Sequence, residues 1–177
     1  EHPDLVHFPH FNVPLLYNKP FVVTIHDLLW HEQIGFAATT LPKWVYVIKF
    51  AGYRLVLRHA VTKSKAIIVP SNWVKRELIK RFPVVTEKTH MIYEGVTDAF
   101  KGPTPPRRGR TLLDRFGLTA QTYLIYVGSL YPHKNVAILL NVLKDFSKLK
   151  LLVACARSTF WERFSKEVKA KGLSDRV

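Results

Sequence analysis

The sequence of 177 residues is poor in cysteine, and no part of it is apolar enough for a membrane span. Its one cysteine, Cys155, excludes a disulfide framework and fits a reducing compartment, so we expect a cytoplasmic protein. No apolar run is long enough to span a bilayer, so no transmembrane helix is predicted. There is also no dense group of Cys, His, Asp and Glu residues, so we expect neither a metal nor another cofactor.

Acidic residues are few: 13 Asp and Glu stand against 27 Lys and Arg, a formal net charge of +14. This excess favours polyanionic partners, which are nucleic acids, anionic lipids or phosphorylated substrates. A basic nucleic-acid-binding module would show a known binding fold or a basic recognition helix. We find neither and expect no nucleic-acid partner, although such a module stays an alternative.

Two common nucleotide-binding motifs are missing as well. There is no G-x-G-x-x-G dinucleotide fingerprint and no G-x-x-x-x-G-K-[ST] P-loop. The hydrophobic content of 47% is nevertheless enough for a buried core. The chain lacks an initiator methionine, opens at Glu1 and stops at Val177 just after a helical pattern, so we expect a fragment of a longer protein.

The stretch from Tyr123 to Val136 has the pattern strand, glycine loop, helix. The β-branched and aromatic run 123–127 predicts a strand buried on both faces. Gly128 then permits a sharp turn, and Pro132 suits a first helical turn. From Asn135 onward, apolar residues recur at helical spacing: Ile138, Leu139, Val142, Leu143 and Phe146.

This arrangement predicts a phosphate site. The first N–H groups of a helix are unpaired and carry partial positive charge, and Lys134 adds an ammonium group there. The alternative is a lysine that only solvates the surface, as most lysines do in such loops.

A second strand, 21–25, delivers His26 and Asp27 at its carboxyl end, where ligands gather in open α/β sheets. The pair therefore has a functional interpretation. The alternative is a histidine held by loop carbonyls and an aspartate that caps a turn. His31 and Glu32 follow on what we expect to be a loop.

The remaining pattern predicts two α/β domains. Strands are expected at 66–69 and 90–93, with Ser71 as N-cap of a helix over 73–82. A proline-rich polar linker covers 98–120 and includes a short helix at 111–116. A strand at 149–154 and a helix at 158–171, which Gly172 ends, complete a parallel βαβ unit in 121–177. The first domain is then 1–97.

Four blocks in order resemble glycosyltransferase family 4, which has the GT-B architecture. They are the His26-Asp27 pair, the Ser71 to Leu78 segment, Glu94-Gly95-Val96 and the Val127 to Val136 loop. The resemblance implies two Rossmann-like parallel-sheet domains, both incomplete in this chain. It further implies a retaining enzyme without a metal, which moves a sugar from a nucleotide-diphosphate sugar of the GDP-mannose or UDP-sugar type. The acceptor would be a glycan or a lipid-linked glycan in polysaccharide or cell-envelope biosynthesis.

The resemblance also implies roles for single residues. His26 would lie by the transferred sugar, in the cleft between the domains, with Asp27 orienting it or its loop, and Lys134 would bind the diphosphate. These three form the expected catalytic set, whereas the expected substrate-binding positions are Gly128, Ser129, His133, Asn135, Glu94 and Gly95.

The sequence departs from the family pattern at several positions. Ser129 replaces an arginine found in many members, and Glu94 and Thr97 replace the asparagine and aspartate of an Asn-Gly-Val-Asp segment. The family's donor-binding glutamate pair would lie beyond Val177. We therefore expect the fragment to be inactive, and a non-catalytic ligand-binding relic of the same fold stays an alternative.

The longest helical pattern runs from Leu41 to Val61 and has two sides. One arc is expected to face the core: Trp44, Val45, Ile48, Ala51, Leu55 and Val56. Lys43, Arg54 and Arg58 lie on the other side, beside Tyr46, Phe50 and Tyr53. Basic residues among aromatics suit an anionic membrane surface, so we expect peripheral docking on the inner face. The alternative is a helix with buried aromatics and solvated charges.

Overall fold

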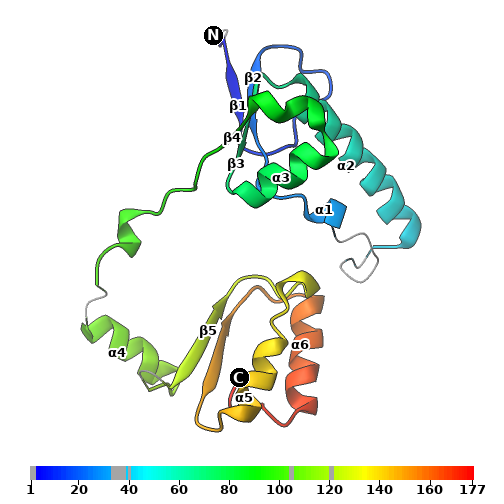
Figure 1. Ribbon diagram of the computed structural model, residues 1–177. Coiled ribbons are helices and arrows are strands. Elements are labelled where there is room, and N and C mark those ends of the chain that lie inside the picture. Colours follow the sequence, from blue (N-terminus) through cyan, green and yellow to red (C-terminus); the bar gives the residue numbers. More distant parts are fainter. Residues whose placement is uncertain (1–2, 33–38, 40, 104–105, 120–121) are drawn as a thin grey trace. The chain divides into compact units, whose positions relative to one another are not determined.

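The computed structural model describes residues 3–32, 39, 41–103, 106–119 and 122–177 (Figure 1). The chain divides into two compact units, Glu1–Val96 and Thr97–Val177. The residues expected to form a linker, 98–120, thus fall within unit 2, and each unit is described by itself.

Unit 1 contains a four-stranded parallel sheet. Its strands are β1 (Val6–Phe8), β2 (Phe21–Thr24), β3 (Ala66–Val69) and β4 (Thr89–Met91), and they lie in this order across the sheet. The strands predicted at 21–25 and 66–69 are confirmed, and the one predicted at 90–93 begins and ends earlier. Because neighbours are parallel throughout, all four carboxyl ends lie at one edge.

The helices of unit 1 are α1 (Leu29–Glu32), α2 (Lys43–Lys63) and α3 (Asn72–Arg81), followed by a 3₁₀ helix, η2 (Pro83–Lys88). The Ser71 hydroxyl accepts a hydrogen bond from the Val74 N–H at 3.3 Å, so the predicted N-cap is confirmed. His31 and Glu32 belong to α1 rather than to a loop, because the Asp27 carboxylate caps the turn that begins there.

The core of unit 1 lies between one face of this sheet and the helices α2 and α3 (Figure 1). Alternate strand residues point to that face because side chains alternate along a strand. The core members are Phe21, Val23, Ile25, Ile67 and Val69 from the strands and Tyr53, Leu57, Ala60, Val61, Val74 and Leu78 from the helices.

The predicted core face of α2 is wrong. Trp44, Ile48 and Leu55 are 69%, 64% and 57% exposed, whereas Tyr46 and Tyr53 are buried. Apolar residues surround most of this helix, so spacing alone does not decide which arc turns inward. Ring contacts accompany the observed choice, because the Tyr46 ring stacks on those of Trp30 and Phe50.

Unit 2 contains two parallel strands, β5 (Tyr123–Val127) and β6 (Lys150–Ala154). Its helices are α4 (Pro106–Arg115), α5 (Ile138–Asp145) and α6 (Thr159–Ala170), with 3₁₀ helices η3 (Asp98–Phe100) and η4 (Pro132–Lys134). The predicted βαβ unit is confirmed, as is the end of α6, where Gly172 has a positive φ of 68°. The core consists of Val136, Leu140, Leu143, Leu151, Phe164, Val168 and Leu173.

Three local predictions for unit 2 are wrong. The helix expected at 111–116 begins at Pro106, which is well placed in a first helical turn. Strand β5 is covered on one face, since α5 and α6 lie on the same side of it, and Ile125 and Val127 are 59% and 72% exposed (Figure 1). The helix expected from Asn135 begins at Ile138, so its inward residues are Leu140 and Leu143, whereas Ile138 and Phe146 are exposed.

Candidate functional site

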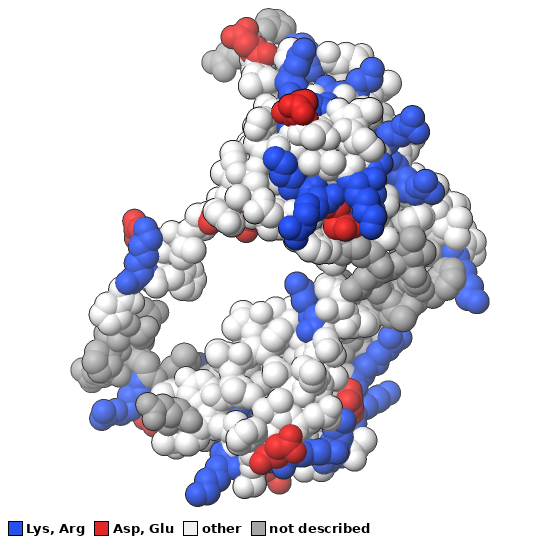
Figure 2. Space-filling view, in the orientation of Figure 1, with Lys and Arg blue, Asp and Glu red and all other residues white. Residues whose placement is uncertain are grey.

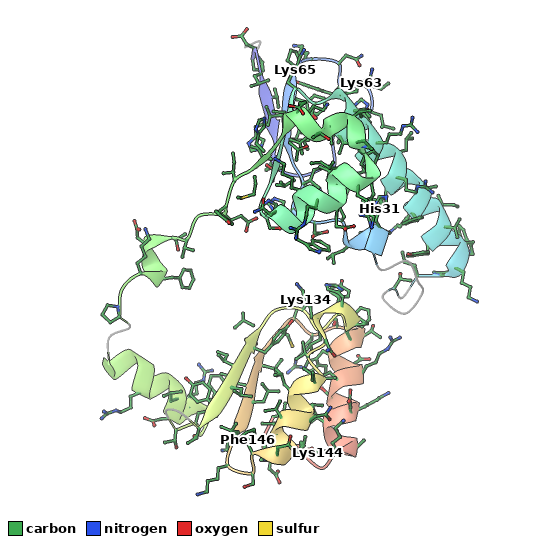
Figure 3. All side chains as sticks on the ribbon, viewed as in Figure 1. His31, Lys63, Lys65, Lys134, Lys144 and Phe146 are labelled. Carbon is green, nitrogen blue, oxygen red and sulfur yellow. The ribbon has the colours of Figure 1, made fainter. Side chains whose placement is uncertain are left out.

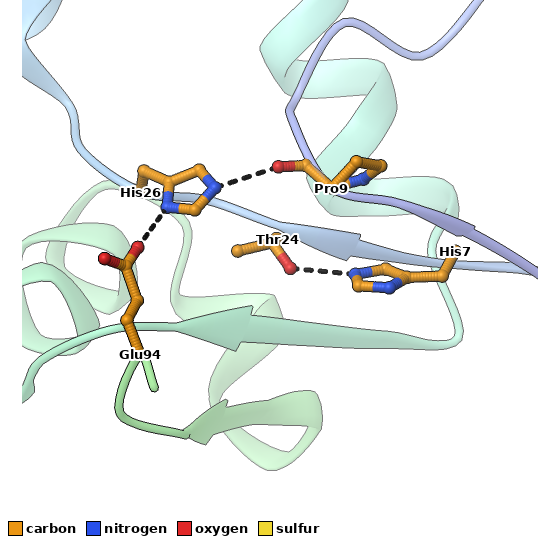
Figure 4. A network of polar contacts seen from close by, with 5 residues as sticks. All are labelled: His7, Pro9, Thr24, His26 and Glu94. Carbon is orange, nitrogen blue, oxygen red and sulfur yellow. Dashed lines mark hydrogen bonds and ion pairs between the residues drawn. The ribbon is translucent and has the colours of Figure 1, made fainter. Parts of the chain in front are cut away.

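His26 lies at the carboxyl edge of the unit 1 sheet, where it connects the ends of three strands. Its Nδ1 atom is 2.7 Å from Oε1 of Glu94, and its Nε2 atom is 2.9 Å from the carbonyl oxygen of Pro9 (Figure 4). Pro9 directly follows β1, His26 follows β2 and Glu94 follows β4. We call these three residues the His26 site.

The sheet itself brings the three residues together. Its ladder continues past the strands, because the Ile25 N–H donates to the Ile68 carbonyl and the Ile92 N–H donates to that of Val69. His26 therefore leaves the sheet at the same level as Glu94. The glutamate side chain then spans the width of β3 to reach the imidazole.

Both neighbours of the imidazole are hydrogen-bond acceptors. A neutral imidazole has a single N–H and donates to one of them, whereas an imidazolium donates to both. When both bonds form at once, the site holds an imidazolium–carboxylate pair. The side chains of His26 and Glu94 are 44% and 66% exposed, so the pair is open to a ligand from solvent.

Asp27 has a different role from its neighbour. Its Oδ1 atom accepts from the Leu29 N–H at 3.1 Å, which caps α1 and shapes the loop after β2. The carboxylate bonded to His26 is that of Glu94, which sequence reasoning assigned to substrate binding. The sequence placed both residues after predicted strands, but the order of the strands, which brings them to one edge, comes from the structure.

His7, His10 and Gly95 are close in sequence to the residues of the His26 site. His7 lies on β1 and its Nε2 atom is 2.8 Å from the Thr24 hydroxyl, so it is held within the sheet (Figure 4). The His10 ring packs on Phe11 at 4.1 Å between centroids. A Cβ added at Gly95 would meet no atom within 4 Å, so open space adjoins this residue beside Glu94.

The predicted phosphate loop of unit 2 opens at Gly128, whose φ of 146° favours glycine. Its N–H donates to the Ala154 carbonyl at 3.0 Å, so the Gly128 amide is not free for a phosphate as expected. The Tyr126 hydroxyl donates to the Ser129 carbonyl at 2.7 Å and would lie 3.2 Å from a Cβ at Gly128. The Ser129 amide has no partner among the described residues.

Lys134 ends η4 and lies four residues before α5 instead of at its start. Asn135 adopts a left-handed conformation with φ 47°, which separates the two helices. The first three N–H groups of α5 donate to the carbonyls of the preceding turn at 3.0–3.2 Å, so these helix donors are already satisfied. The exposed Lys134 lies at this end of unit 2 (Figure 3). It follows His133, whose ring stacks on that of Tyr131.

The sequence profile of Glycosyltransferase Family 4 matches residues 1–100, more than half of the chain. The chain belongs to glycosyltransferase family 4. This confirms the resemblance that the four sequence blocks carry.

Two curated relatives match across both units. One is the alpha-D-kanosaminyltransferase of Streptomyces kanamyceticus, 26% identical over 164 residues that cover 89% of this chain and 40% of the relative. The other is the O-antigen chain mannosyltransferase RfbU of Salmonella typhimurium, 25% identical over 98% of this chain and 42% of the relative. The chain thus spans about two fifths of the length of these relatives.

Solved structures confirm the fold. HepE of Anabaena in complex with UDP-glucose matches with a TM-score of 0.67 at 20% identity, over 90% of this chain and 41% of HepE. A glycosyltransferase from Rickettsia africae matches with a TM-score of 0.64 at 18% identity, over 98% of this chain and 45% of the other. The predicted α/β architecture of the GT-B type is therefore confirmed.

In the residues that the structure describes, no group of three or more His, Cys, Asp or Glu residues is arranged to hold a metal ion. Within the same described ranges, every helix is too short or too polar to cross a membrane.

Proposed function

We propose that this chain supplies the His26 site and the Lys134 loop of a retaining glycosyltransferase. The enzyme moves a sugar from a nucleotide-diphosphate sugar to a glycan or lipid-linked acceptor in polysaccharide or cell-envelope biosynthesis. The observation that carries the proposal is the His26–Glu94 pair at the ligand-binding edge of a parallel sheet. The family, a mannosyltransferase relative and the UDP-glucose complex of HepE support it.

Lys134 supplies the charge that the reaction needs in unit 2. Breaking the bond between sugar and diphosphate leaves negative charge on the departing phosphate, and a group that meets this charge lowers the barrier. The amides of Gly128 and of the α5 start are already bonded. Because Ser129 replaces the arginine of many members, Lys134 and the Ser129 amide carry most of this role.

His26 binds the transferred sugar, and Glu94 holds the ring in place for it. The ring also bonds the Pro9 carbonyl through Nε2. A sugar hydroxyl that accepts from Nε2 replaces this carbonyl, whereas the bond to Glu94 persists and keeps the ring orientation. Asp27 supports the same loop by capping α1.

The outer face of α2 docks the protein on the inner surface of an anionic membrane. The basic residues of this face are Lys43, Arg54 and Arg58, as expected from the sequence. The apolar residues beside them differ from the expected aromatic ones. Tyr46 and Tyr53 are buried, and the exposed apolar residues are instead Trp44, Val47, Ile48 and Leu55. An exposed apolar stripe with basic flanks suits the headgroup boundary, where a lipid-linked acceptor is confined.

The experiment that tests the function is turnover of the full-length protein with UDP-glucose and GDP-mannose, measured as release of the nucleotide. His26→Ala should lower kcat by roughly 10²-fold, as loss of a group that acts in the transition state does. His7→Ala is the matched control, since His7 is a histidine of the neighbouring strand held by Thr24. If kcat of His26→Ala were as high as kcat of His7→Ala, the proposed role of His26 would be refuted.

A further inference from the structure

Three arginines from two helices line one hollow on the surface of unit 1, and the hollow shares no lining residue with the His26 site. The hollow is lined by His31, Arg54, Leu55, Arg58, Arg81 and Phe82. Arg54 and Arg58 are one turn apart on α2, and Arg81 is the last residue of α3. Figure 2 shows lysine and arginine side chains gathered on the face of unit 1 that carries α3.

The charges of this hollow are only partly compensated. Nη1 of Arg81 donates to the Glu77 carboxylate at 2.5 Å and to the Glu77 carbonyl at 3.1 Å. That bond from Arg81 holds the pKa of Glu77 below its ordinary value, so the glutamate stays ionised. Among the side chains that the structure describes, neither Arg54 nor Arg58 forms an ion pair, whereas Arg81 does.

His31 forms one wall of the hollow and is fixed in place. Its Nδ1 atom is 2.7 Å from the Tyr53 hydroxyl, so Nε2 is the ring nitrogen left for a ligand. Burial lowers the pKa of His31, and the nearby charges of Arg81 and Arg54 lower it further. The ring is therefore neutral at pH 7, and a bound anion would raise its pKa again.

We propose that this hollow, the Arg54 site, binds a phosphate or diphosphate group. Arginine presents several N–H groups in one plane and forms paired hydrogen bonds with phosphate oxygens. Arg81 has five N–H groups, of which Glu77 occupies those of Nη1, so the others are left for a ligand. The two guanidinium charges of Arg54 and Arg58 equal in number the negative charges of a phosphate monoester dianion.

The surroundings of the Arg54 site fit a phosphate carried by a lipid. Leu55 belongs both to the hollow and to the apolar stripe with Trp44 and Ile48. A lipid phosphate bound at Arg54 and Arg58 would thus have exposed apolar side chains next to it for its chain. Free phosphate compounds share the same chemistry, so the experiment compares both sources.

The test uses the 177-residue chain and two-dimensional NMR of the histidine rings. Pyrophosphate should shift the His31 signals in a saturable way and raise the pKa of His31. Arg54→Gln with Arg58→Gln should weaken this binding at least tenfold. The matched control is Lys75→Gln with Arg76→Gln, which removes the same charge from α3 outside the hollow and should change binding less than twofold. Equal weakening by both pairs, or no saturable shift of His31, would overturn the site.

A second comparison identifies the source of the phosphate group. Vesicles of phosphatidylcholine with phosphatidic acid are compared with soluble glycerol phosphate at equal phosphate concentration. If the wild type binds the vesicles more tightly than glycerol phosphate, and the Arg54/Arg58 variant loses this binding, the ligand of the site is a lipid phosphate. If the wild type binds both with equal affinity, the ligand is a soluble phosphate compound. The His26→Ala variant should bind both ligands as the wild type does. The test of the Arg54 site is therefore independent of the transferase reaction.

Discussion

Oε1 of Glu94 lies 2.7 Å from Nδ1 of His26, although the two residues are 68 positions apart in the chain. The contact joins the carboxyl ends of β2 and β4, two strands that are not neighbours in the sheet. Glu94 occupies a position where the family usually has asparagine. At this position the carboxylate brings to the His26 ring a negative charge that an asparagine amide lacks.

Replacing Glu94 by Gln should lower kcat of the full-length protein about tenfold, because the amide keeps the shape but loses the charge that holds His26. The melting temperature should change little, since the Glu94 side chain is 66% exposed. Steady-state kinetics and thermal unfolding measure both effects. Glu87→Gln, an exposed glutamate of η2, is the control. Wild-type kinetics for Glu94→Gln would contradict the role of the pair.

Replacing Lys134 by Ala should lower turnover by roughly 10²-fold or more, as loss of one transition-state donor does. Lys144→Ala provides the control, because Lys144 is an exposed lysine of α5 in the same unit (Figure 3). Release of the nucleotide from a sugar donor is the measurement. A lysine that only solvates the loop would leave turnover within about twofold of wild type.

Replacing Lys43, Arg54 and Arg58 together by Gln should weaken binding to anionic vesicles. Each basic residue near such a surface contributes about 1 kcal/mol, so the loss should be roughly 10²-fold at low salt. Sedimentation with vesicles at low and high salt measures it. Unaltered binding would show that this face of α2 is not the docking surface.

The exposed apolar residues of the same face should contribute to vesicle binding at any salt concentration. Trp44→Ser with Ile48→Ser should weaken vesicle binding at high salt too, because burial of apolar area does not depend on screening. Ile138→Ser in unit 2, 54% exposed, is the control. An effect confined to low salt would show that the apolar stripe does not enter the lipid.

The stability of unit 1 should fall as the pH drops through and below about 6.5, the ordinary pKa of histidine. Burial and the nearby arginines lower the pKa of His31 in the folded state, so the unfolded chain binds the proton more readily. The stabilisation is present above the unfolded pKa and is lost as the pH falls through the folded one.

Chemical denaturation of His31→Gln and wild type between pH 8 and pH 5 measures this effect. The variant should lose less stability than the wild type over this range, whereas His7→Gln should follow the wild type. Parallel curves for all three proteins would show that His31 does not contribute.

Local patterns in the sequence predicted most elements of the fold. The apolar runs at Phe21 and Ala66 became buried strands because they fit a sheet covered by helices. Ser71 and Gly172 mark helix ends because their preferences act over a few residues. The four family blocks, read in order, likewise identified the family and the GT-B type of architecture.

Tertiary structure alone decided which partners the candidate residues have. The spacing of α2 permitted two inward arcs, and the stacking of Tyr46 with Trp30 and Phe50 selected one. The backbone turn at Asn135 satisfied the amides expected to bind phosphate. His26 bonds Glu94 rather than its neighbour Asp27 because strand order, and not distance along the chain, determines which side chains meet at the sheet edge.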